Sequence, residues 1–161
     1  MTQETIGPVL GRIPSGVFIL TAKIESGSET GMLASWVQQA SFDPPAVTVA
    51  VNKKRYLNSA LTEGTCVVLN LLGESNKKML GHFGAGFEPD EPAFEGLNTE
   101  KSPAGLTILK DGLGWLEGQI TSSVDAGDHV IYVVQLSTAG ANDSLESDKP
   151  FVHIRKNGFN Y

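Results

Sequence analysis

Residues 31–55 read GMLASWVQQASFDPPAVTVAVNKKR, and this stretch predicts much of the fold. It opens with a β-prone segment, Gly31–Phe42, in which small and polar residues occupy positions where a core strand carries valine or isoleucine. Pro44 and Pro45 supply no backbone donors, so we expect that strand to end before them. Val47–Val51 is strongly β-branched and predicts a second, buried strand, which runs into a cluster of positive charge.

The same stretch has the features of a ligand site. Small side chains between Ala34 and Ser41 expose the backbone to a flat polar ligand, and the cations of Lys53–Arg55 offer a site for an anionic tail. A flat ring with a phosphate tail describes flavin mononucleotide (FMN). Two alternatives are a polar edge strand that faces water and a solvated strand end. An exposed edge with an unpartnered Trp36 is unfavourable, which argues against the first.

Residues 31–55 also resemble the flavin reductase-like family of FMN-binding split barrels, and the likeness continues along the whole chain. The subgroup that it resembles includes the flavin reductase domain fused to some flavodiiron proteins. Further motifs match in order: Arg12–Thr21 the opening strand, His82–Pro89 with Phe94–Leu97 a mid-chain insertion, Gly127–His129 a strand entry, and Val152–Arg155 the final strand.

The resemblance implies which residues bind the cofactor. In the family, the backbone at the positions of Ala34–Gln38 lies along the pyrimidine side of the flavin ring. Ser41 and the turn that begins at Asn52 are the phosphate candidates, because a hydroxyl, backbone amides and a guanidinium suit a dianion. Family members often carry serine or threonine where this chain has Lys54, and we expect Arg55 rather than Lys54 to reach the phosphate. The expected cofactor-binding residues are therefore Ala34, Ser35, Trp36, Val37, Gln38, Ser41, Asn52, Lys53 and Arg55.

Three histidines are candidates for chemistry. His129 follows Gly127-Asp128 at a strand start, and the resemblance places it near the flavin ring, where it is expected to act as a catalytic proton partner. The alternative is a turn residue with a satisfied ring. His153 and Arg155 lie two residues apart on the final strand and face the same way, so they are secondary candidates for the phosphate or a subunit contact. His82 is as compatible with packing as with function, and no histidine, cysteine and carboxylate spacing suggests a metal.

The remaining pattern predicts an antiparallel β-barrel with a few short helices rather than a Rossmann sheet, because there is no βαβ rhythm. Residues 84–105 lack periodicity but contain Phe87 and Phe94, so we interpret them as a packed lid or a dimer arm. Strands are expected over Gly16–Ala22, Cys66–Leu72, Trp115–Val124, His129–Leu136 and Phe151–Arg155, with helices over Tyr56–Thr62 and Glu74–Phe83.

Bulk properties bound the function. At 161 residues, 40% of them hydrophobic, the chain is expected to form one domain over residues 1–161. A net charge of −6 argues against a nucleic-acid or anionic-membrane surface. No run approaches the ~20 apolar residues of a membrane helix. No secretory signal is visible and Cys66 is the single cysteine, which together favour a cytoplasmic location.

These features lead to one expected function and one alternative. The fold is expected to be a mainly β, antiparallel Greek-key split β-barrel. The resemblance implies an NAD(P)H-dependent flavin reductase that transfers hydride from NADH or NADPH to bound FMN, or FAD, and passes the electrons to free flavin, a redox protein, oxygen or an iron complex. Because the chain lacks the Gly-x-Gly-x-x-Gly fingerprint, a nicotinamide nucleotide must dock on the flavin face. The family's flavin lies between two subunits, which implies a homodimer. The alternative is a non-catalytic FMN-binding electron carrier.

Overall fold

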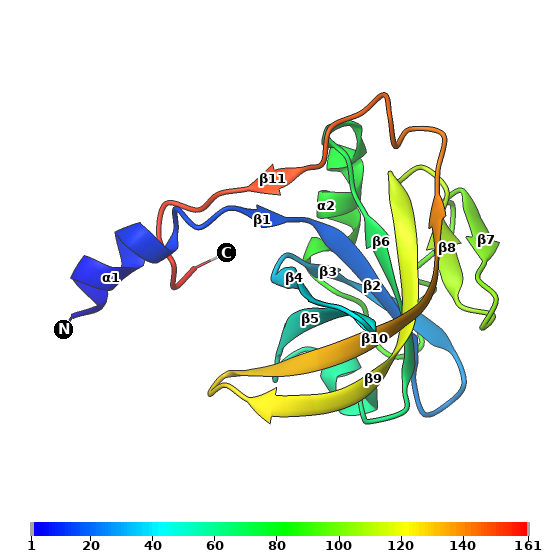
Figure 1. The fold of residues 1–161 in the computed structure, drawn as a ribbon, viewed down its shortest axis with the longest axis horizontal. Coiled ribbons are helices and arrows are strands. Elements are labelled where there is room, and N and C mark those ends of the chain that lie inside the picture. The colour runs from blue at the N-terminus through cyan, green and yellow to red at the C-terminus, as the bar shows by residue number, and fades with distance from the viewer. Residues whose placement is uncertain (1, 161) are drawn as a thin grey trace.

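A seven-stranded antiparallel sheet forms the body of the protein in the computed structural model, which describes residues 2–160 (Figure 1). Met1 and Tyr161, the ends of the expected domain, lie outside the described residues. The strands are β2 (Phe18–Lys23), β3 (Glu29–Ala34), β4 (Val37–Phe42), β5 (Pro45–Asn52), β6 (Cys66–Leu71), β9 (Gly114–Asp125) and β10 (His129–Ala141). Their order in the sheet is β3-β2-β6-β9-β10-β5-β4.

Smaller elements surround this sheet. Two short strand pairs add to it, β1 with β11 and β7 with β8, and residues 2–160 also contain four helical segments. Their bounds are α1 (Gln3–Leu10), β1 (Ser15–Gly16), the 3-10 helices η1 (Tyr56–Ala60) and η2 (Glu74–Asn76), α2 (Lys77–Gly84), β7 (Thr99–Lys101), β8 (Thr107–Leu109) and β11 (Val152–His153).

The chain crosses from one end of the sheet to the other between β3 and β4. Residues 35 and 36 belong to neither strand, and the backbone N–H of Ala50 donates to the carbonyl of Trp36 at 3.0 Å. The expectation of one strand over Gly31–Phe42 is therefore wrong. Its first half pairs with β2, where Ala34 faces Phe18, and its second half pairs with β5. A covalent link rather than a strand ladder thus closes the barrel, and the antiparallel split-barrel fold is confirmed.

The core lies on both faces of β2, because alternate residues of a strand point to opposite sides. Leu20 and Ala22 are fully buried inside the barrel among side chains of β5, β6, β9 and β10. Ile19 is equally buried on the other face, where it packs in a cluster with Phe83 of α2. Burial on both sides explains why this strand is apolar almost throughout.

Residues 84–105 cover the outer face of β2 and β3. Phe83 is fully buried, and its ring centroid lies 5.6 Å from that of Phe87 and 5.8 Å from that of Phe94. A Cβ on Gly31 would come within 2.9 Å of Phe94 and 3.0 Å of Phe83, so only glycine lets β3 approach these rings so closely. His82 reaches back to the carbonyl of Ala93 at 2.8 Å. Residues 84–105 therefore pack as a cover over the sheet. The last part of this segment contains β7, which pairs with β8.

The two ends of the chain form an arm that projects from the barrel (Figure 1). The N–H of Gly158 donates to the carbonyl of Gly7 at 2.7 Å, and that of Arg155 donates to Gly11 at 2.8 Å. A Cβ on Gly158 would lie 2.2 Å from the Cβ of Leu10, so glycine at this position allows the tail to pack closely against α1. The sequence did not predict α1, which contains Gly7 and Pro8 and has no clear apolar stripe.

Other expected elements are present with different bounds. The hairpin over Trp115–Val124 and His129–Leu136 is confirmed and is longer, as β9 and β10. The strand expected over Gly16–Ala22 is interrupted at Val17, and the final strand is limited to β11. The expected helix over Tyr56–Thr62 is the 3-10 helix η1, and the one over Glu74–Phe83 is divided into η2 and α2.

Candidate functional site

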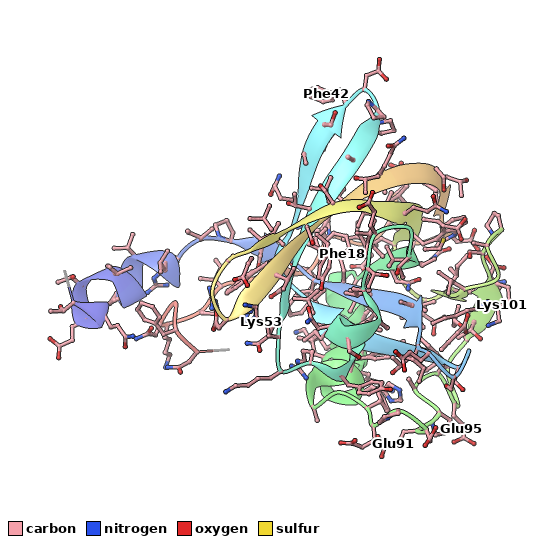
Figure 2. All side chains as sticks on the ribbon, turned by 90° about the horizontal axis from the view of Figure 1, so that it is seen from below. Phe18, Phe42, Lys53, Glu91, Glu95 and Lys101 are labelled. Atoms are coloured by element: carbon pink, nitrogen blue, oxygen red, sulfur yellow. The ribbon has the colours of Figure 1, made fainter. Side chains whose placement is uncertain are left out.

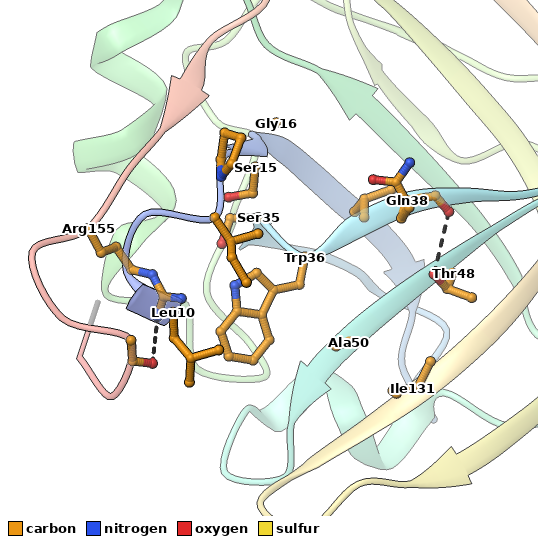
Figure 3. A pocket seen from close by; sticks show the side chains of 14 residues that line it. Leu10, Ser15, Gly16, Ser35, Trp36, Gln38, Thr48, Ala50, Ile131 and Arg155 are labelled. Carbon is orange, nitrogen blue, oxygen red and sulfur yellow. Dashed lines mark hydrogen bonds between the residues drawn. The ribbon is translucent and has the colours of Figure 1, made fainter. Parts of the chain in front are cut away.

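Three cavities meet around the crossover between β3 and β4. The central cavity, of 240 Å³, lies between Ala34, Trp36, Asn52 and Arg55. The arm cavity, of 440 Å³, shares Ser35, Trp36 and Ala50 with it and extends to the root of the arm, and Figure 3 shows the side chains that line it. The outer cavity, of 340 Å³, shares Met32 and Arg55 with the central cavity. The shared residues make one continuous groove along β3.

One side of this groove is the unpaired edge of a strand. Among residues 2–160, β3 pairs only with β2, so its second row of backbone N–H and C=O groups faces the groove. Unpaired backbone groups are strong hydrogen-bonding partners. Ala34 on β3 and Ala50 on β5 line the central cavity with short side chains, so the cavity comes close to this backbone. The groove therefore suits a flat ligand that carries hydrogen-bonding atoms on its edge.

Trp36 divides the central cavity from the arm cavity, and two side chains hold its ring. The imidazole of His129 lies 4.7 Å from the indole between ring centroids, at 37°. The guanidinium of Arg155 lies 5.1 Å from the indole centroid, within the range of a cation–π contact. Arg155 also donates to the tail carbonyl of Gly158 at 3.1 Å, so the tail is tied to the site (Figure 3).

His129 lies behind Trp36 rather than on the cavity wall. It is 6% exposed, and its Nδ1 is 2.8 Å from an oxygen of Asp128. That hydrogen bond lowers the pKa of the Asp128 carboxyl, so Asp128 is ionised near neutral pH and accepts the bond while Nδ1–H donates. In neutral His129 the proton is then on Nδ1, and Nε2 is the acceptor. Its contact with the groove runs through the Trp36 ring.

The three cations of the basic cluster, Lys53–Arg55, have different surroundings in the structure. Lys53 pairs with Asp125 at 2.6 Å, and this hydrogen bond is the main cause that lowers the pKa of the Asp125 carboxyl. Lys54 lines the outer cavity, and its backbone N–H donates to the side chain of Asn52 at 2.9 Å. Arg55 lines both the central and the outer cavity. Neighbours in sequence thus point to different places.

Arg55 is held in place by the carboxyl end of α2. Its guanidinium donates to the carbonyls of Gly84 and Ala85, each at 3.3 Å, where a cation is favoured by the helix dipole. Gly86 has φ of +83°, and a Cβ there would lie 3.0 Å from the guanidinium. Glycine at this position therefore permits both the turn and the close approach of Arg55. A guanidinium has five donors, and only these two bonds are formed within residues 2–160.

The structure brings together most of the residues predicted from sequence. Ser41 is an exception, because it pairs with Ala46 towards the tip of the β4–β5 hairpin, where Phe42 is 90% exposed (Figure 2). Lys53 and His129 are not among the residues that line the three cavities. On the central cavity lie Ala34, Ser35, Trp36, Asn52, Arg55 and His153, and on the arm cavity lie Ser35, Trp36, Val37, Gln38 and Arg155.

Sequence reasoning missed the residues that complete the groove. Tyr56 and Glu91 line the outer cavity, and Leu10 and Ile13 of the arm line the arm cavity. A tyrosine directly after the basic cluster was the one available signal, since tyrosine is enriched at interfaces, where its ring packs and its hydroxyl stays wet. The others are assembled by tertiary structure and had no local signature.

No metal or membrane feature accompanies this groove. Across residues 2–160, no three His, Cys, Asp or Glu side chains lie close enough to hold a metal ion. In the same range, no helix is long and apolar enough to cross a bilayer.

Cys66 is half-buried on β6, and burial, with a smaller effect from the Glu117 carboxylate, raises the pKa of its thiol. A raised pKa argues against a reactive thiolate there.

Comparison with known proteins gives consistent relatives. The family model described as the flavin reductase like domain matches residues 10–160. Diflavin flavoprotein A 1 of Synechocystis sp. is 39% identical over 154 residues, which are 94% of this chain and 26% of that protein. The chain spans 26% to 28% of the length of three curated relatives.

Solved structures show the same fold. The NADH:FAD oxidoreductase of Streptomyces globisporus superposes with a TM-score of 0.82 at 23% identity, over 91% of this chain and 85% of that one. The styrene monooxygenase flavin reductase of Pseudomonas putida gives a TM-score of 0.77 at 26% identity, over 91% and 90% of the two chains.

Proposed function

The chain belongs to the flavin reductase-like domain family, and from that premise we propose that it binds FMN and reduces it with NADH or NADPH. One observation carries the proposal. A continuous groove runs along the unpaired edge of β3 from Trp36 to Arg55, with a planar, backbone-lined end and a cationic end. This order matches a ring, a ribityl chain and a phosphate.

The residues of the central cavity fit such a ligand. Ala34–Trp36 would hold the flavin ring through the hydrogen-bonding groups of their backbone. Arg55 takes the phosphate with donors that the α2 carbonyls do not use, and a guanidinium suits a phosphate better than an ammonium does. A bound flavin supplies the two-electron chemistry, accepting hydride from the nicotinamide and passing the electrons onward.

The arm cavity is the site for the nicotinamide. It lies on the other side of Trp36, and its walls are mainly apolar, with Ile13, Ile131 and Ala50 among them. An apolar site that excludes water protects a hydride in transfer. Arg155, over the Trp36 ring, provides a positive charge for the anionic part of the dinucleotide. The onward acceptor is free flavin or a redox protein.

A homodimer completes the arm cavity. Val9 is 70% exposed, Ile13 59% and Phe159 46%, and all three belong to the projecting arm. Exposed apolar patches of this kind mark interaction surfaces. Because Ile13 also lines the arm cavity, a second subunit on this patch would cover the flavin face. Ile13→Asp should convert a dimer to a monomer in analytical ultracentrifugation, and a wild-type chain that is monomeric at high concentration would refute this part.

A non-catalytic FMN carrier is the second candidate, and the position of His129 favours it. The residue expected to exchange protons is 6% exposed and lies behind Trp36, away from the residues that line the groove. A carrier needs the ring and phosphate sites but no proton partner or nicotinamide site.

Two measurements test the proposal and separate the candidates. The visible spectrum of the purified chain, followed by titration with FMN, tests binding, and a chain that binds no flavin would exclude both candidates. Anaerobic stopped-flow mixing with NADH and NADPH then tests reduction. Bleaching of the flavin band within seconds supports the reductase. A flavin that dithionite reduces but neither nicotinamide nucleotide does would identify the carrier.

A further inference from the structure

The outer cavity lies beyond Arg55, at the phosphate end of the groove. Arg55 and Met32 line both this cavity and the central cavity, so whatever follows the first phosphate of a flavin enters the outer cavity. FMN ends at its phosphate, whereas a flavin dinucleotide continues through a second one. We propose that Glu88 and Glu91, in the wall of the outer cavity, repel the second phosphate and make the site selective for the mononucleotide. The inference rests on the proposed flavin site, because it concerns which ligand that site accepts.

The central and outer cavities differ in charge. Among residues 2–160, Arg55 is the only Lys, Arg, Asp or Glu that lines the central cavity. The outer cavity adds Lys54 from the turn after β5, but the segment that follows α2 adds Glu88 and Glu91, so the formal charges of these four side chains cancel. An anion is therefore attracted to Arg55, at the boundary between the two cavities, and gains no further attraction by moving outward.

The two flavin nucleotides distribute their phosphate charge differently. A phosphate monoester such as FMN carries about −1.5 to −2 charges at pH 7, and all of this charge would lie beside Arg55. Each phosphate of the diphosphate in FAD carries a single negative charge. A bound dinucleotide would leave one charge at Arg55 and bring the other into the outer cavity, towards the carboxylates of Glu88 and Glu91. The mononucleotide gains more from the guanidinium and meets less repulsion.

The acidic part of the cavity wall is held by a short turn. A carboxylate oxygen of Glu91 accepts the backbone N–H of Glu88 at 2.8 Å, and the backbone N–H of Glu91 donates to the carbonyl of Glu88 at 3.1 Å. Within residues 2–160, neither carboxylate forms an ion pair. Residues 79–100 contain no lysine or arginine, and Asp90 and Glu95 are exposed beside the turn (Figure 2). The negative charge of this wall is therefore positioned and is not neutralised by an ion pair.

The experiment measures selectivity as the ratio of the Kd of FAD to the Kd of FMN. Fluorescence titrations with riboflavin, FMN and FAD are made on the wild type, Glu88→Gln, Glu91→Gln, the double variant and Glu95→Gln. Glutamine keeps a hydrogen-bond acceptor in a side chain of similar size and removes the charge. Glu95→Gln is the matched control, because Glu95 belongs to the same segment and does not line the outer cavity.

Removing the two charges should improve the binding of FAD more than that of FMN. We expect each single variant to lower the Kd of FAD about threefold and the double variant about tenfold, while the Kd of FMN changes by less than about threefold. Riboflavin, which has no phosphate, should bind all variants equally. In the wild type the ratio should fall between about 0.1 M and about 1 M salt, because the screening length shortens from about 10 Å to about 3 Å. It should fall less in the double variant.

Four results would overturn the inference while the flavin site stands. The first is a wild type that binds FAD as tightly as FMN, and the second is a double variant with an unchanged ratio. The third is a double variant that binds FAD more weakly, which would mean that the carboxylates hold the sugar hydroxyls of the dinucleotide. The fourth is an equal effect of Glu95→Gln, which would assign the selectivity to general surface charge. A wild type that binds no flavin would overturn both the inference and the flavin site.

Discussion

Replacing Arg55 with alanine should separate FMN from riboflavin. These two ligands share the ring and the ribityl chain and differ in the phosphate. Arg55 lines the central cavity and is positioned by the carbonyls of Gly84 and Ala85, so its guanidinium is already oriented before a ligand arrives. Removing it should weaken FMN strongly and riboflavin little.

The magnitude follows from the contacts of the guanidinium. A hydrogen bond to a charged group contributes about 1.5–3 kcal/mol. Arg55 is half-buried and shared with two backbone carbonyls, so we take about 2 kcal/mol for its net effect on a bound phosphate. This corresponds to a roughly 30-fold rise in the Kd of FMN. Loss of the bonds to α2 acts on both ligands equally and is therefore removed by the comparison with riboflavin.

Lys53→Ala is the matched control, because it removes a cation two positions away. Lys53 forms its ion pair with Asp125 and lies at the β9–β10 hairpin (Figure 2). Fluorescence titration of both variants with both ligands should show a large FMN effect for Arg55→Ala alone. Equal losses of FMN and riboflavin in Arg55→Ala would refute the phosphate role. An effect of Lys53→Ala as large as that of Arg55→Ala would refute the separation of the cluster.

Three other predictions test the surroundings of the groove. Phe83→Ala should lower the free energy of unfolding in urea by about 3–5 kcal/mol, since the ring is fully buried, and a change below 1 kcal/mol would mean that residues 84–105 are not docked. Hydrogen bonds from the hydroxyl and N–H of Ser75 lower the pKa of the Asp148 carboxyl in the folded state, so the stability that they provide is present above the unfolded pKa of ~3.9 and is lost as pH falls through the folded value. The wild type should therefore be more stable than Asp148→Asn at pH 7 and lose this advantage below pH ~4; a difference that persists at pH 2 would contradict it. His129→Ala should slow reduction by NADH about tenfold while FMN stays bound, because Trp36 loses the ring that positions it. Unchanged stopped-flow kinetics would show that His129 is only a structural residue of the turn.

The local features of the sequence predicted most of the barrel. β5 is encoded by a β-branched run after two prolines, and the β9–β10 hairpin by two β-prone runs around a turn of Asp and Gly. Such patterns depend on neighbours in the chain, so they can be recognised from the sequence alone. Residues 34–38, which the resemblance assigns to the cofactor, line the central and arm cavities, and their role in binding stays a prediction.

The features that the sequence did not predict depend on distant partners. The break at Ser35-Trp36 arises because β3 and β4 find different neighbours, β2 and β5, and nothing within the run specifies those neighbours. Lys53 was assigned to the phosphate with Arg55, but its carboxylate partner, Asp125, is 72 residues away. Arg55 is positioned by α2, and the outer cavity exists only because the segment after α2 folds back beside β3. Tertiary contacts override local proximity in each case.

The crossover gives a physical reason why the ligand groove lies where it does. A barrel closed by two residues instead of a ladder leaves the outer edges of β3 and β4 without strand partners among residues 2–160. The edge of β3 faces the groove, and such an edge is a liability that natural sheets cover. Here Trp36 and Arg155 cover the edge from the arm side, and Arg55 with α2 covers it from the other. Between them, residues 33–36 line the central cavity. A planar ring with hydrogen-bonding atoms along one side meets the same requirement as an added strand, and it needs less space than a strand does. Under the proposed function, the closure of the fold and the binding of the ligand would therefore both depend on the same two residues, Ser35 and Trp36.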